Sequence, residues 1–267
     1  MKELVPKPLV AKYSAVTTQP EKVREKVAIS PKKIVFFLLA FAFSLLSINV
    51  ALFILVAEFG AQHPILEKIL YKFDLNTEFN IPTLFSCSLY VFASVLLYFV
   101  SRLKSERKKG NKWFWKILSW LFIFLCLDEA LEIHEKFDYL NRYFNIKDQK
   151  TSMHDPWIIF YFLFILAIGG LFVKFLLSLP KKTRNLFMIA GVSLCVAAMG
   201  FEIPESYIFY KYGVNAAYRA FYCFEEVMEM CSVILFIYAI LDYLTVYNGV
   251  RLTYEPPAPK TKMAAQS

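Results

Sequence analysis

Long uncharged stretches alternate with short charged ones along the chain. The first, residues 34–57, holds no Asp, Glu, Lys or Arg, and five others are predominantly apolar. A helix needs about 20 apolar residues to cross roughly 30 Å of hydrocarbon. The pattern therefore predicts an all-α, polytopic integral membrane protein with six transmembrane helices, near residues 34–57, 82–101, 113–134, 157–178, 185–203 and 219–246.

The two ends of the chain differ from this membrane domain. Residues 1–33 and 249–267 mix Lys, Pro, Thr and Ala without helical or strand periodicity. Polar segments of this kind bury too little apolar surface to offset the entropy lost on ordering. We expect two disordered cytoplasmic tails around a six-helix transmembrane domain at residues 34–248.

Basic residues gather in alternate connections between the predicted helices. Residues 1–33 hold eight Lys and Arg, and residues 102–112 hold six more. Short loops rich in Lys and Arg stay on the cytoplasmic side of a membrane. The N- and C-termini are therefore predicted to be cytoplasmic, in a bacterial inner membrane or a related one.

Composition agrees with a protein whose main partner is the lipid bilayer. Hydrophobic residues make up 58% of the chain, more than in a typical soluble domain. The net charge of +8 comes from the residues that orient the chain, so no nucleic-acid partner is expected. The five cysteines form no Cys-x-x-Cys pair, and we interpret them as buried free thiols rather than as a disulfide framework.

Acidic and histidine side chains interrupt three of the predicted helices. A charged side chain at the centre of a spanning helix costs roughly 2.5–3.5 kcal/mol on the insertion scale. Given the predicted orientation, all three groups lie near the extracytoplasmic surface, at a common depth. Such a convergence is what one shared site requires, and the groups are Asp128-Glu129-x-x-Glu132-x-His134-Glu135, Glu202, and Glu225-Glu226-x-x-Glu229.

Carboxylates together with one or two histidines are typical ligands of Zn²⁺, Fe or Mn. The leading hypothesis is thus a divalent metal site, in a protein that could be a metal-dependent enzyme acting on a lipid-soluble substrate. Neither the Glu-x-x-His motif of di-iron bundles nor His-Glu-x-x-His is present. The candidate ligands are Asp128, Glu129, His134, Glu135, Glu202, Glu226 and Glu229, with His154, Glu225 and Glu132 as further candidates.

Two other functions use the same side chains. Intramembrane carboxylates form proton relays in pumps, so a proton- or cation-coupled transporter or channel is one alternative. The acids could instead pair with Arg219, Lys136 or Arg142 as salt bridges in a non-catalytic membrane subunit or scaffold. The sequence leaves these alternatives open.

The order of these acids resembles a pattern in uncharacterised bacterial multi-pass integral membrane proteins. The resemblance rests on Asp128-Glu129-x4-His134-Glu135, on Glu202, and on Glu225-Glu226-x2-Glu229. It implies a multi-pass membrane fold in which these residues form one set, and it implies no activity.

Overall fold

The structure is a computed structural model that describes residues 27–28, 30–59, 63–108, 110–131, 133, 136, 157–250 and 253–254. The chain divides into two units. The smaller holds the two strands β1 (Val27–Ala28) and β2 (Thr253–Tyr254), which pair antiparallel with Val27 opposite Tyr254. In the larger, Ile29–Leu252, the regular secondary structure of the described residues is helical throughout.

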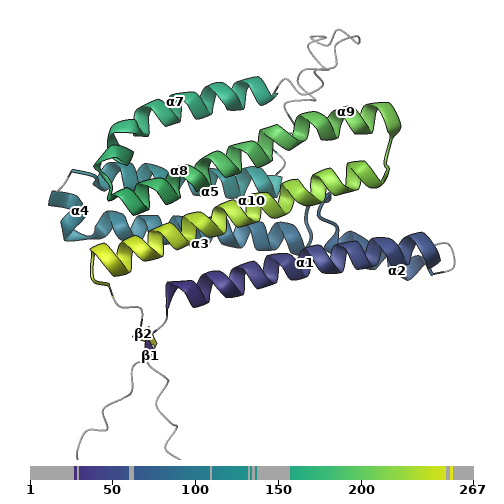
Figure 1. Ribbon diagram of the computed structural model, residues 1–267, viewed down its shortest axis with the longest axis horizontal. Coiled ribbons are helices and arrows are strands. Elements are labelled where there is room, and N and C mark those ends of the chain that lie inside the picture. The colour runs from purple at the N-terminus through teal and green to yellow at the C-terminus, as the bar shows by residue number, and fades with distance from the viewer. Residues whose placement is uncertain are drawn as a thin grey trace, which may run out of the picture. The chain divides into compact units, whose positions relative to one another are not determined.

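Long antiparallel helices build the larger unit (Figure 1). The α8 helix continues through the π-helix η1 into α9, and α10 continues into the π-helix η2. Two short helices, α2 and α4, connect longer ones. The bounds are α1 (Pro31–Phe59), α2 (Pro64–Phe73), α3 (Ile81–Arg102), α4 (Lys104–Lys108), α5 (Lys112–Leu131), α7 (Trp157–Ser178), α8 (Lys181–Cys195), η1 (Val196–Phe201), α9 (Glu202–Tyr212), α10 (Ala216–Asp242) and η2 (Tyr243–Tyr247).

The all-α fold class is confirmed, and four helical segments are long and apolar enough to cross a membrane. They are Pro31–Phe59, Ile81–Arg102, Lys181–Tyr212 and Ala216–Tyr247. The α5 helix falls outside this set because Lys116, Asp128 and Glu129 place three charged residues in every membrane-length stretch of it. In α7 the apolar part whose side chains are described is shorter, Phe162–Ser178.

The fifth predicted helix does not end before Pro204, as the sequence suggested, but continues to Tyr212. A proline inside an α-helix lacks the N–H of one hydrogen bond, and its ring clashes with the carbonyl four residues earlier. Here the π-helix η1 lies immediately before that turn and widens the backbone. Such π-turns accommodate an interruption without breaking the helix, and they are frequent at functional sites.

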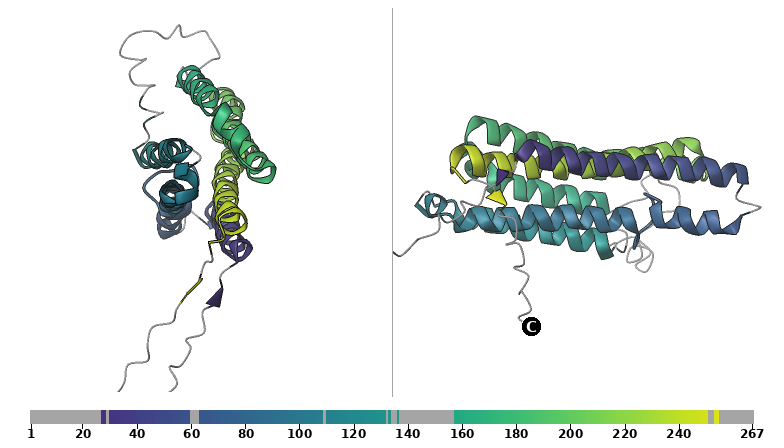
Figure 2. Two further views of the ribbon diagram at one scale, coloured as in Figure 1. Left: turned by 90° about the vertical axis from the view of Figure 1, so that its left-hand side faces the viewer. Right: turned by 90° about the horizontal axis from the view of Figure 1, so that it is seen from below.

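The α10 helix is the centre of the packing. Within its membrane-length segment, 72% of the most apolar window is buried, against 22% for α1. It packs against α1, α3 and α8, while α3 and α5 form a close pair beside it (Figure 2). Its most buried side chains include Met230, Ile234 and Ile237, so this helix positions the residues of the others.

One end of the bundle is fixed by a buried carboxylate. Glu106 of α4 is fully buried and accepts hydrogen bonds from Trp115 Nε1 at 2.8 Å and from the Tyr243 hydroxyl at 2.6 Å. Lys182 of α8 pairs with Asp242 of α10 at 2.5 Å. We call this the basic end, formed by α4, the start of α8 and η2.

Candidate functional site

The candidate carboxylates lie toward the opposite end, formed by α2, α9, the first turns of α10 and the last turn of α5, and we call it the acidic end. The α10 helix begins at Asn215, whose side-chain oxygen accepts hydrogen bonds from the backbone N–H groups of Ala217 at 2.8 Å and Tyr218 at 3.0 Å. Such an N-cap fixes the start of a helix. Glu225, Glu226 and Glu229 then follow within its first four turns.

Glu225 is 9% exposed and meets α9. Its side chain shares a hydrogen bond with that of Glu205 and interacts electrostatically with Glu202 and Glu229. Two carboxyl groups form a hydrogen bond only when a proton lies between them, because an ionised carboxylate only accepts. The α9–α10 contact therefore brings two carboxyl groups close together.

Glu226 faces different helices. It interacts electrostatically with Glu129 of α5, with Glu229 one turn along α10, and with Glu78 in the loop before α3. Glu129 and Glu226 belong to different acidic groups of the sequence and are almost a hundred residues apart in the chain. In the fold they lie within electrostatic range of each other. On α10, Glu225 thus interacts with acids of α9, and Glu226 interacts with an acid of α5.

Tyr90 of α3 lies among the same acids. It is 4% exposed, and its ring packs on Phe122 of α5 with the ring centroids 6.3 Å apart. It interacts electrostatically with four acids, Glu229, Glu129, Glu226 and Asp128. A phenol can donate a hydrogen bond to a carboxylate, so Tyr90 adds a neutral polar group to the site.

The loop before α3 holds Glu78 in place. Thr83 Oγ1 donates to Glu78 Oε2 at 3.1 Å, and Asn80 caps the helix by accepting from the Thr83 N–H at 3.1 Å. The Asn80 amide also donates to the carbonyl oxygens of Asp74 and Thr77. The loop backbone is thereby tied to the start of α3, and Glu78 with it.

The sequence missed three members of this site. Glu205 lies one turn beyond Glu202, and extending the helix past Pro204 would have revealed it. Glu78 lies in a connection and Tyr90 in an apolar helix, where no periodic signal singles them out. Glu132, His134, Glu135 and His154 lie outside the described residues.

The described side chains do not by themselves form a metal centre. Within the ranges that the structure covers, no three His, Cys, Asp or Glu side chains are grouped closely enough to hold a metal ion. Asp128, Glu129, Glu202 and Glu229 each make further interactions in addition to those given above. The carboxylates therefore form a polar cluster, not a compact coordination shell.

The basic residues that the sequence suggested as salt-bridge partners of the acids make other contacts where the structure describes them. The Arg219 guanidinium lies over the Phe53 ring of α1, 4.2 Å from its centroid. Lys136 donates a hydrogen bond to the backbone carbonyl of Leu131. Arg142 lies outside the described residues. Arg219 is thus held by an aromatic ring of a neighbouring helix, as in a cation–π contact.

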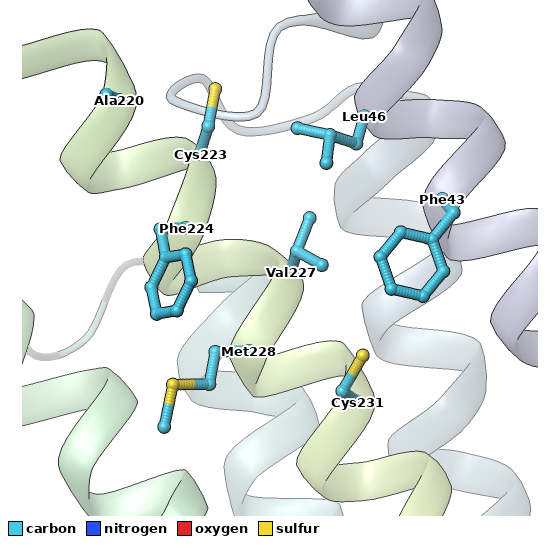
Figure 3. A pocket seen from close by; sticks show the side chains of 8 residues that line it. All are labelled: Phe43, Leu46, Ala220, Cys223, Phe224, Val227, Met228 and Cys231. Atoms are coloured by element: carbon cyan, nitrogen blue, oxygen red, sulfur yellow. The ribbon is translucent and has the colours of Figure 1, made fainter.

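An apolar groove of about 470 Å³ lies between α1 and α10 (Figure 3). Phe43 and Leu46 of α1 face Val227 and Cys231 of α10 across it. At 100° per residue, Glu229 points to the side of α10 opposite Val227. The groove is therefore separate from the carboxylate cluster.

Comparison with known proteins identifies a family. Residues 29–244, most of the 267-residue chain, match a family model described as a domain of unknown function, DUF8692. No curated protein and no solved structure matches significantly. The matched range begins just before α1 and ends in η2, so it contains every α-helix described above. The chain belongs to the DUF8692 family.

Proposed function

We propose that the protein is a six-span membrane protein with both termini in the cytoplasm and a cation-binding site at the outer boundary of the bilayer. The observation that carries the site is the approach of Glu226 to Glu129, Glu229 and Glu78, from three parts of the chain. Like charges gathered in one place attract cations, and several such carboxylates need a counter-ion or a shared proton.

Helix length supports the depth of this site. The segments Lys181–Tyr212 and Ala216–Tyr247 have 32 residues each, or about 48 Å at 1.5 Å per residue. Hydrocarbon occupies only ~30 Å of that, or about 20 residues. With the basic end at the cytoplasmic surface, the bilayer then ends close to Glu202 on one segment and close to Glu229 on the other.

A divalent metal ion is the first candidate cation. Zn²⁺, Fe²⁺ or Mn²⁺ accepts carboxylate ligands, and helical bundles hold such ions with Glu side chains from facing helices. Glu226 of α10 and Glu129 of α5 lie within electrostatic range of each other. From the sequence, His134 and Glu135 are proposed to complete the set. A metal at this depth would be accessible to a lipid-soluble substrate. The metal-dependent enzyme that we propose therefore acts on such a substrate.

Metal analysis tests this proposal. Full-length protein purified in detergent is equilibrated with Zn²⁺, Mn²⁺ or Fe²⁺, freed of excess metal, and its metal content measured. We expect about one ion per chain, lost on Glu226→Gln combined with Glu229→Gln. The control is Glu67→Gln, which removes an exposed carboxylate of α2 outside the cluster. Equal metal content in wild type and double variant would exclude a metal at these residues.

A proton-coupled transporter is the second candidate, favoured by the hydrogen bond between Glu205 and Glu225. A proton held between two helices is a natural element of a relay. In proteoliposomes we expect an imposed cation or pH gradient to drive flux that Glu225→Gln abolishes and Glu67→Gln leaves intact. If neither metal binding nor flux is found, while the variants only lower stability, the cluster serves a structural role in a membrane subunit or scaffold.

A further inference from the structure

The α3 and α5 helices approach each other closely along a line of small side chains. Ser94 Oγ donates to the Ser119 carbonyl at 2.8 Å, and Ser119 Oγ donates to the Ser94 carbonyl at 2.9 Å. A serine side chain is only one bond longer than an alanine, so reciprocal bonds of this kind require the two backbones to lie close together. Small residues permit such an approach in membrane helices.

Cys87 and Cys126 repeat this arrangement two turns away. Cys87 lies seven residues before Ser94, and Cys126 lies seven residues after Ser119, which is the same register in an antiparallel pair. As in the serine pair, the Cys87 side chain donates to a backbone carbonyl of the other helix, with Sγ 3.6 Å from the Cys126 oxygen. Its thiol also meets the Cys126 thiol. The two cysteines are thus the sulfur counterpart of the serine pair.

We propose that Cys87 and Cys126 form a reversible disulfide that links α3 to α5. A disulfide needs Cα atoms about 4.4–6.8 Å apart and side chains that point toward each other. The contact of the two thiols and the 3.6 Å between Cys87 Sγ and the Cys126 carbonyl oxygen favour such a geometry. The other cysteines are placed differently, since Cys223 and Cys231 lie eight residues apart on α10, about 12 Å along its axis.

The oxidant is a small disulfide, and the reaction is thiol–disulfide exchange. One protein thiol attacks the small disulfide, which releases one small thiol and leaves a mixed disulfide on the protein. The second protein thiol attacks that bond and releases the second small thiol. The two protein sulfurs are oxidised, the small disulfide is reduced to two thiols, and both protons end on those thiols.

The charged groups near Cys87 favour one class of oxidant by its charge. Cys87 interacts electrostatically with Glu129 and Glu78 as well as with Cys126. A field of carboxylates attracts cations and repels anions. A cationic small disulfide such as cystamine therefore reaches the pair more readily than an anionic one such as oxidised glutathione.

The consequence for function rests on the proposed site. Glu129 follows Cys126 by less than one turn, so a bond at Cys126 restrains the backbone that carries Glu129. On the proposed topology this pair lies in the outer half of the membrane, next to an oxidising compartment in which disulfides persist. The bond would fix one wall of the carboxylate cluster when the protein is oxidised.

The experiment uses full-length protein in detergent and cystamine as the probe. Free thiols are counted by maleimide labelling and intact mass before and after exposure, and links are located by peptide mapping. We expect the number of labelled thiols to fall from five to three, with a Cys87–Cys126 link and recovery by a reductant. Oxidised glutathione should produce the same link at a lower rate.

Two variants serve as controls. The triple variant Cys195→Ser, Cys223→Ser and Cys231→Ser should still lose both remaining labels. The double variant Cys87→Ser and Cys126→Ser should lose none to cross-linking, and it keeps a serine pair like Ser94 and Ser119. Mixed disulfides alone, a link between other cysteines, or five unchanged thiols would overturn the proposal. This test involves no metal or ion flux, so its failure leaves the cation site untouched.

Discussion

At the scale of single residues, the basic end depends on Glu106. The Tyr243 hydroxyl donates a hydrogen bond of 2.6 Å to this fully buried carboxylate. Removing one donor from a buried acceptor costs about 1–3 kcal/mol, because the acceptor loses its bond without regaining water. We therefore expect Tyr243→Phe to lower the free energy of unfolding by that amount, measured by denaturation in detergent micelles.

The matched control is Tyr247→Phe, since Tyr247 lies one turn further along and is 45% exposed. A surface hydroxyl of this kind contributes within about 0.5 kcal/mol. Equal effects of the two substitutions would show that the hydrogen bond to Glu106 does not stabilise this end of the protein.

The sequence predicted individual site residues only where they interrupt an apolar pattern. Glu129, Glu225, Glu226 and Glu229 stand out because charge is rare in a membrane helix, and helix direction alone placed them at one depth. Glu78 could not be predicted in this way, because an acid in a polar connection is ordinary. Its place depends on the hydrogen bonds of Asn80 and Thr83, which only the folded loop reveals.

At the scale of elements, the turn between α9 and α10 depends on one glycine. Gly213 has φ +68° and ψ −167°, a backbone conformation that is essentially restricted to glycine. Its N–H donates to the Phe209 carbonyl at 2.9 Å and so ends α9. A Cβ at this position would meet no atom within 4 Å, so any cost of a side chain comes from the backbone alone.

Gly213→Ala should therefore destabilise the protein by about 1–3 kcal/mol. Gly169→Ala is the matched control, because Gly169 lies inside α7, where an added Cβ also meets nothing within 4 Å. Alanine in a helix interior is favoured over glycine by about 0.5–1 kcal/mol. We expect the two substitutions to shift the melting temperature in opposite directions, and two shifts of the same sign would contradict the backbone explanation.

Helix existence followed from hydropathy, whereas helix ends did not. The apolar runs correctly indicated where helix forms, since a span needs length and few charges. The extension of the fifth helix to Tyr212 was missed because Pro204 is a strong terminator in sequence terms. A π-turn such as η1 has no sequence signature that separates it from ordinary α-helix, so the correction required the structure.

At the scale of the whole molecule, charge sets the proposed orientation. Lys181 begins α8 at the basic end, and Val214 lies in the turn between α9 and α10 at the acidic end. Both side chains are exposed, and Val214 is 60% exposed. If Lys- and Arg-rich connections stay in the cytoplasm, then these two positions lie on opposite sides of the membrane.

Single cysteines test this arrangement in intact cells. In a background with the five native cysteines replaced by serine, Val214→Cys should react with a membrane-impermeant maleimide added outside, while Lys181→Cys should react only after permeabilisation. Both should react in detergent, which controls for accessibility. Labelling of Lys181→Cys but not Val214→Cys in intact cells would invert the topology, and the carboxylate cluster would then face the cytoplasm. The proposed site would in that case bind its cation from the cytoplasm. The orientation therefore determines from which side of the membrane the cation binds.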